Sequence, residues 1–127
     1  MSLELFDTHC HLDLDPLAGE INAVLARARA AGVRHCLSIG TTVEASRANV
    51  ELARRHPGVR AAVGVHPHDA DTVTDESLEA IDRLAGEPEV IAIGEVGLDY
   101  YRARSPDRKS TRLNSSHSAK SRMPSSA

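Results

Sequence analysis

Residues 59–68, VRAAVGVHPH, run from an apolar stretch directly into two histidines. The stretch follows the helix-breaking pair Pro57-Gly58, and its valines favour a strand over residues 59–65. The first polar side chain after this expected strand is His66. A strand that delivers a polar side chain at its end is the unit that recurs through the rest of the chain.

The alternation of apolar strands with amphipathic helices extends on both sides of this stretch. Gly32, Gly40 and Pro57-Gly58 separate the segments, and the strands recur at a spacing of roughly 30 residues. This rhythm is typical of a parallel sheet with crossover helices. The expected strands are residues 3–8, 33–39, 59–65 and 90–94, and the expected helices are residues 16–31, 41–56 and 74–86.

Local signals set the start of each expected helix. Pro16 opens the first helix, and Asp13 and Asp15 precede it as candidate capping residues. The sequence Thr41-Thr42-Val43-Glu44 has the spacing of a capping box for the second helix. Either Thr74 or Asp75 is expected to cap the third.

The composition excludes several classes of function. With two tyrosines, one phenylalanine and no tryptophan, the chain lacks an aromatic platform on which single-stranded nucleic acid would stack. No apolar run approaches the roughly 20 residues of a membrane span, and the first residues lack the features of a signal peptide. Cys10 and Cys36 form neither a CxxC pair nor a disulfide framework. We therefore expect a cytoplasmic protein without a membrane partner.

The net charge of −3 is distributed unevenly along the chain. Residues 107–127 contain five basic side chains and one acid, a net charge of +4, which leaves −7 for residues 1–106. A negative body excludes a broad cationic surface for nucleic acid. Phosphate chemistry in this chain would therefore need a metal to supply positive charge.

Residues 107–127, DRKSTRLNSSHSAKSRMPSSA, have a separate origin in our interpretation. Residues 107–117 correspond to the translation of a common short-read sequencing adapter, and residues 121–127 resemble its continuation. We expect residues 1–106 to form the folded domain and residues 107–127 to be a non-native, disordered tail. The alternative is a native, basic and serine-rich tail, which would be disordered as well.

Polar side chains also follow the other expected strands. His9 and His11 are two residues apart at the end of the first strand, so both imidazoles face the same side, and Glu95 follows the fourth strand. In an α/β barrel the active face is formed by the carboxyl ends of the strands. Imidazole and carboxylate groups gathered there would bind a divalent cation. Cys10 faces the opposite way and is expected to pack under a helix.

Each of these residues also has a structural interpretation. A His-x-His pair alone can lie on the surface or cap a helix, and His66 can simply hold a turn. His68 is interpreted as a turn or surface residue. Glu95 is the hardest to explain in this way, because a carboxylate that follows a buried strand is costly unless it is paired or bound to a metal.

Three motifs together resemble the TatD family of metal-dependent deoxyribonucleases, within the amidohydrolase superfamily. They are DTHCHLD at residues 7–13, GVHPH at residues 64–68 and GEVGLDYY at residues 94–101. The resemblance implies a (β/α)₈ barrel in which His9, His11 and Glu95 are ligands of a divalent metal centre and Glu95 bridges two ions. It also implies that His66 lies near the substrate phosphate.

The chain departs from the family in length. A (β/α)₈ barrel typically has about 250 residues, and the two later histidines and the later aspartate that complete the family's metal site have no counterpart here. We therefore expect the N-terminal half of a barrel, with four strands and three helices in alternation. Half of the ligand set would bind metal weakly, so the fragment itself is expected to be inactive, and no catalytic residue is assigned.

The function implied for the intact parent is hydrolysis of phosphodiester bonds in DNA with two divalent ions (Mg²⁺, Mn²⁺ or Zn²⁺) and no protein partner. One alternative is another hydrolase of the superfamily, acting on an amide, an ester or aminoacyl-RNA. A phosphoesterase similar to histidinol phosphatase also begins with His-x-His, but its usual continuation is absent after His11. The non-enzymatic alternative is a small metal-binding module.

Overall fold

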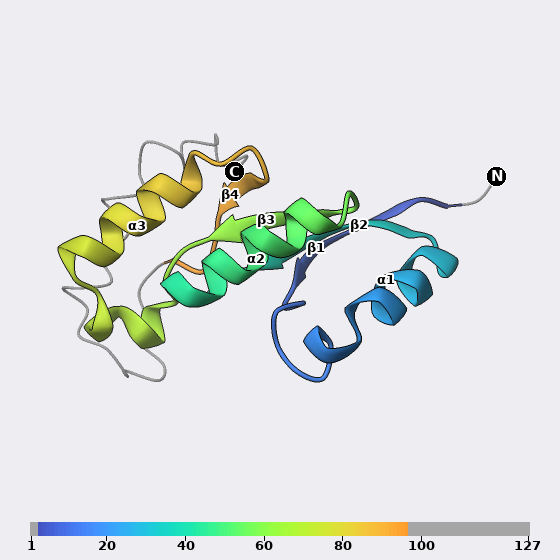
Figure 1. Cartoon of the computed structure of the whole chain (residues 1–127), viewed down its shortest axis with the longest axis horizontal. Coiled ribbons are helices and arrows are strands. Elements are labelled where there is room, and N and C mark those ends of the chain that lie inside the picture. Colours follow the sequence, from blue (N-terminus) through green and yellow to red (C-terminus); the bar gives the residue numbers. More distant parts are fainter. Residues whose placement is uncertain (1–2, 97–127) are drawn as a thin grey trace, which may run out of the picture.

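The structure, a computed structural model, describes residues 3–96 of the 127-residue chain. Its centre is a four-stranded sheet in the order β1-β2-β3-β4 (Figure 1). Neighbouring strands are parallel in every pair. The strands are β1 (Leu5–Cys10), β2 (Val33–Ile39), β3 (Val59–Val63) and β4 (Val90–Ile93). The predicted parallel architecture is therefore confirmed.

Helices connect these strands and cover one face of the sheet. α1 (Ile21–Ala30) packs on β2, α2 (Val43–Arg55) packs on β2 and β3, and α3 (Asp75–Ala85) packs on β3 and β4. Two short 3-10 helices, η1 (Ala18–Glu20) and η2 (Pro67–Thr72), precede α1 and α3. Crossovers between parallel neighbours are right-handed, so each one places its helix on the same side of the sheet.

The core lies between this helical layer and the sheet. Val59, Ala61 and Val63 of β3 are fully buried and pack in one cluster with Val50 of α2 and Ile81 of α3. Complete burial of a side chain such as Ile81 contributes about 1.5–3 kcal/mol. β3 is enclosed because it has a strand on each side and two helices on its face, whereas β1 is exposed along most of its length.

The first helix begins later than predicted. Residues 15–17 form a turn, and the regular helix starts only at Ile21, after η1. The reason is local: the dihedral angles of Glu20, φ −128° and ψ 29°, lie outside the helical region and separate η1 from α1. Neither Asp13 nor Asp15 caps this helix, because Glu20 occupies the N-cap position and no side chain caps it.

Threonines cap the other two helices. Thr42, rather than Thr41, caps α2, and its Oγ1 accepts the backbone N–H of Ala45 at 3.0 Å. The predicted capping box is therefore wrong by one residue, because Ala45 and not Glu44 occupies the third helical position. Thr74 caps α3 with a reciprocal box that includes Ser77.

The strand ends differ from the prediction where they meet the candidate site. β1 extends to Cys10, so His9 lies inside the strand, and β3 ends at Val63, before Gly64. The predicted tail at residues 107–127 and the domain boundary at residue 106 lie outside the described residues. Within residues 3–96, no helix is both long enough and apolar enough to cross a membrane.

Candidate metal centre

Two histidines and one carboxylate converge at the carboxyl end of the sheet. His9 lies in β1, His11 follows it, and Glu95 follows β4. One potential ligand atom of each residue lies within 4.8 Å of the other two. His9 Nε2 is 2.8 Å from Glu95 Oε1. The structure therefore brings together the three residues that the sequence analysis selected as metal ligands.

The meeting of β1 and β4 side chains shows that the sheet is curved. These strands are the two edges of the described sheet, and in a flat sheet they would lie about 14 Å apart at ~4.8 Å per strand. Contact between His9 and Glu95 across this span requires the sheet to bend toward the face opposite the helices. Bending of this kind is what closes a sheet into a barrel.

His11 is fixed in one tautomer by the neighbouring strand. Its Nδ1 lies 3.0 Å from the carbonyl oxygen of Ile39, the last residue of β2. A carbonyl can only accept a hydrogen bond, so Nδ1 carries the proton and Nε2 keeps its lone pair. Metal-binding histidines commonly have this arrangement, in which one ring nitrogen donates to the protein and the other is left for the ion.

His66 contacts the same carboxylate from β3's side of the site. Its Nδ1 accepts the backbone N–H of His68 at 3.0 Å, and its Nε2 lies 3.2 Å from Glu95 Oε2. The two oxygens of Glu95 are thus shared between His9 and His66. The expected role of His66 beside a substrate phosphate stays a prediction, while His68 lies in η2, as a turn residue would.

The backbone around Glu95 is unusual. Its φ is +54°, a region that few non-glycine residues adopt and that typically costs 1–3 kcal/mol. Just before it, Gly94 comes so close to Gly64 that a Cβ on Gly64 would lie only 2.1 Å from the carbonyl oxygen of Gly94. The two glycines therefore let the ends of β3 and β4 approach, and the turn after Gly94 directs the Glu95 carboxylate toward the histidines.

Cys10 lies beside the cluster but is not suited to join it. Its Sγ donates to the carbonyl oxygen of Leu37 at 3.4 Å, and the side chain packs against the core, as predicted. Burial, followed by the negative charge of Asp7, raises the pKa of the Cys10 thiol to about 12. The Cys10 Sγ–H is committed to the Leu37 carbonyl on the core side of β1, and Cys10 is not among the three residues whose ligand atoms converge.

Two polar residues near the cluster were missed by the sequence analysis. Ser38 of β2 and Asn49 of α2 are completely buried and hydrogen-bonded to each other at 2.5 Å. The available signal was an asparagine within the apolar stripe of residues 43–55, next to Val50 and Ala53. Such a residue needs buried partners, and the sequence alone does not show which ones.

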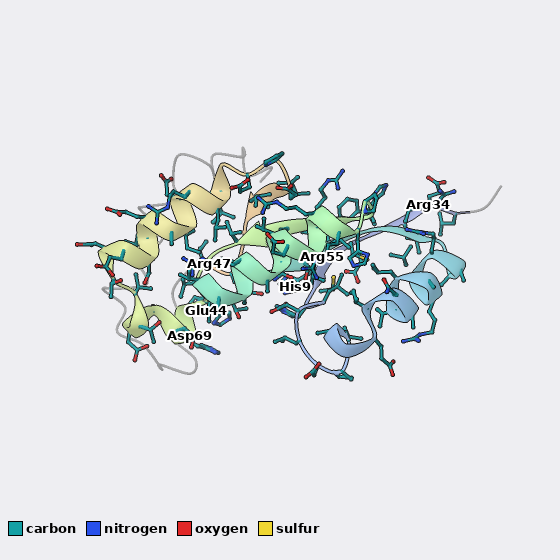
Figure 2. The ribbon with its side chains drawn as sticks, in the orientation of Figure 1. His9, Arg34, Glu44, Arg47, Arg55 and Asp69 are labelled. Atoms are coloured by element: carbon teal, nitrogen blue, oxygen red, sulfur yellow. The ribbon has the colours of Figure 1, made fainter. Side chains whose placement is uncertain are left out.

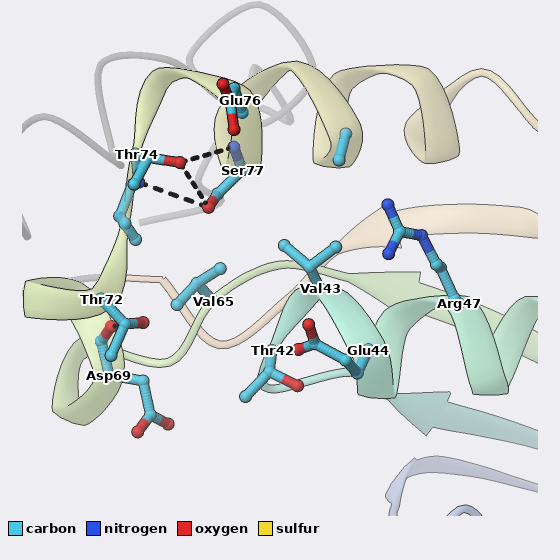
Figure 3. A pocket seen from close by; sticks show the side chains of 12 residues that line it. Thr42, Val43, Glu44, Arg47, Val65, Asp69, Thr72, Thr74, Glu76 and Ser77 are labelled. Atoms are coloured by element: carbon cyan, nitrogen blue, oxygen red, sulfur yellow. Dashed lines mark hydrogen bonds between the residues drawn. The ribbon is translucent and has the colours of Figure 1, made fainter.

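Within the described residues, neither the opposite end of the sheet nor the cavity beside the first turns of α2 and α3 carries such a ligand set. At the amino end, Arg34 pairs with Glu4 at 3.0 Å, and Figure 2 shows Arg34 far along the sheet from His9. A cavity of about 470 Å³ lies between the starts of α2 and α3 (Figure 3). Its lining mixes Arg47 with acids such as Glu44 and includes none of the three candidate ligands.

The donor set fits a divalent ion. Ligand atoms bound at 2.0–2.2 Å to one tetrahedral ion lie about 3.4 Å apart, so the observed spread of up to 4.8 Å needs only small side-chain movements. A parallel α/β sheet that gathers imidazoles and a carboxylate at its carboxyl end has the construction of a barrel-type metal-dependent hydrolase.

Comparison with known proteins gives the family. The model of the TatD related DNase family matches residues 6–117. The chain is 44% identical over 98 residues to the 3′-5′ ssDNA/RNA exonuclease TatD of Cronobacter sakazakii, covering 77% of this chain and 37% of that protein. It is 36% identical over 102 residues to the metal-dependent hydrolase YabD of Bacillus subtilis, covering 80% and 40%. This chain belongs to the TatD related DNase family.

Solved structures agree with this assignment. YJJV, a TatD homologue from Escherichia coli K12, is 31% identical with a TM-score of 0.83, covering 91% of this chain and 46% of that one. A TatD family hydrolase from Entamoeba histolytica, 22% identical, has the same fold, with a TM-score of 0.82 over 94% of this chain and 46% of that one. The chain thus spans about two fifths of the length of the curated relatives named above, and its four strands correspond to half of their barrel.

Proposed function

We propose that this chain supplies four strands and part of the metal centre of a metal-dependent hydrolase that cleaves phosphodiester bonds in DNA. The observation that carries the proposal is the convergence of His9, His11 and Glu95 at the carboxyl end of the sheet. Membership of the family supports it, as does the name of the Cronobacter sakazakii relative, a 3′-5′ ssDNA/RNA exonuclease.

In this proposal His9, His11 and Glu95 would hold a divalent ion, and Glu95 would also help to hold a second one. Mixed nitrogen and oxygen ligands suit Zn²⁺ or Mn²⁺, and Mg²⁺ where carboxylate and water predominate. Such ions supply an activated water and polarise the phosphoryl group. The net charge of −7 over residues 1–106 leaves the ions as the main source of positive charge for a phosphate.

His66 would act on the substrate side of the same carboxylate. Its Nε2 faces Glu95, and its Nδ1 is occupied by the His68 N–H, so the Nε2–H is the group that can donate. If Glu95 held a metal, the His66 Nε2–H would be available to donate to a phosphate oxygen. The imidazole would then orient the phosphate without entering the metal's ligand set.

An exonuclease assay tests this proposal. The gene from which residues 1–106 derive, expressed in full, should shorten end-labelled single-stranded DNA, and chelation of divalent ions should abolish the shortening. His9→Ala should lower the rate by at least about 100-fold. We expect little turnover from the 127-residue chain alone, because the remaining ligands of the family's site are absent from it.

The same preparation separates the alternatives. Turnover of amide or ester substrates without shortening of DNA would contradict the phosphodiester proposal and favour another superfamily activity. Tight stoichiometric Zn²⁺ binding without any hydrolysis would favour a metal-binding module. Both measurements use the protein that the nuclease assay uses, so the three outcomes are directly comparable.

A further inference from the structure

A buried hydrogen-bond chain connects α2 to the segment that follows His11. The backbone N–H of Leu12 donates to Ser38 Oγ at 3.0 Å, and Ser38 Oγ donates to Asn49 Oδ1 at 2.5 Å. Asn49 Nδ2 then donates to Asp13 Oδ1 at 3.2 Å. This series of hydrogen bonds therefore begins at Leu12 and ends at Asp13, the two residues that immediately follow His11.

Packing alone does not explain the choice of these residues. Ser38 and Asn49 are completely buried, and burial of an amide or a hydroxyl costs free energy unless its hydrogen bonds are made. An apolar side chain would fill the space without this requirement. The polar pair adds a positional constraint, because hydrogen bonds fix the positions of the groups that they join.

This positional constraint acts on His11. The ring of His11 is held by Ile39 O through Nδ1, and the backbone just after it is held by Ser38 and Asn49. Both holding points lie on the carboxyl half of β2 or on α2, the elements that form the core. His11 is thereby tied to elements that form the buried core, although it lies beyond the end of β1.

We infer that Asn49, acting through Ser38, Leu12 and Asp13, is a positioning residue that sets His11 for metal binding. This inference rests on the metal centre of the proposed function. Neither Asn49 nor Ser38 belongs to the ligand cluster, so the effect is indirect. A purely structural role would instead lower stability and leave the metal affinity of the folded chain unchanged.

The test measures Zn²⁺ affinity by titration calorimetry and the visible absorption of bound Co²⁺, both in the full 127-residue chain. Thermal unfolding followed by circular dichroism accompanies each variant. Asn49→Ala should weaken Zn²⁺ binding by about 10–100-fold and change the Co²⁺ spectrum. Val50→Ala, the adjacent buried position on α2, should lower the melting temperature without either change.

A reciprocal pair guards against simple misfolding. Asn49→Asp alone places a carboxylate against Asp13 and should weaken Zn²⁺ binding. Asp13→Asn/Asn49→Asp reverses the donor and acceptor of that hydrogen bond while keeping an acceptor for Ser38. The double variant should therefore recover most of the lost affinity, which a loss of fold would not allow.

The outcomes separate this inference from the proposed function. If His11→Ala abolishes Zn²⁺ binding but Asn49→Ala does not weaken it, Asn49 does not position the ligand and the inference is overturned, while the metal centre stands. Absence of rescue in the double variant also overturns it. If the unaltered chain binds no Zn²⁺, or if His11→Ala binds it as well as the unaltered chain does, the metal centre itself is wrong, and the inference falls with it.

Discussion

Glu95 combines an unusual backbone conformation with contacts to two histidines of the candidate site. It has a positive φ, follows a glycine, and divides its two oxygens between His9 and His66. Its place in the site could be predicted, because a carboxylate after a buried strand needs a partner. Its backbone conformation could not, because it depends on the close approach of Gly64 and Gly94, which are 30 residues apart in the sequence.

At this scale we predict that Gly64→Ala is strongly destabilising. The new Cβ would lie 2.1 Å from the carbonyl oxygen of Gly94, so the ends of β3 and β4 would have to separate. We expect a loss of about 3 kcal/mol or more, measured by chemical denaturation. Gly19→Ala, where the nearest atom is 3.7 Å away, is the matched control and should change stability little. Equal stability of the two variants would contradict the close approach.

The helices and strands differ in how far sequence patterns predict them. The four strands and three helices could be predicted from hydrophobic periodicity and from Gly and Pro breaks, since these signals are local. The start of α1 could not be placed, because Pro16 favours a helix start and yet the chain makes a turn and η1 first. The hydrogen bonds of Ser38 and Asn49 could not be predicted either, because their partners come from a distant strand and loop.

A comparison of adjacent threonines tests the capping of α2. Thr42→Ala removes the acceptor of the Ala45 N–H and should cost about 1 kcal/mol. Thr41 makes its contact through its backbone carbonyl, which accepts the N–H of His66, so Thr41→Ala should cost much less. Urea denaturation of both variants measures the difference. A larger loss for Thr41→Ala would restore the capping box that the sequence suggested.

On the scale of the whole molecule, the described sheet has two edges with a strand on one side only. β1 and β4 occupy these edges, and Leu5, Phe6 and Ile91 on them are exposed within the described residues. Unpaired strand edges with apolar side chains favour association between chains. The region that matches this chain covers 37% of the Cronobacter sakazakii relative and 46% of YJJV, so more than half of each of those proteins lies outside the match.

We therefore predict that charge on the β4 edge suppresses self-association of the 127-residue chain. Ile91 is 51% exposed, and Ile91→Lys should shift the sedimentation profile toward the monomer. Glu79→Lys introduces the same side chain on the exposed face of α3 and serves as the control. If the two variants sediment alike, with both as associated as the unaltered chain, then the β4 edge does not drive association.

The curvature that lets His9 touch Glu95 has a thermodynamic consequence. An ion bound by His9, His11 and Glu95 would link β1 to the segment that follows β4. Because these residues meet only when the sheet is bent, the ion could be bound only in the bent sheet. Ion occupancy and folding would then be linked. Each tenfold rise in free ion above its dissociation constant would add about 1.4 kcal/mol to the stability of the bent sheet.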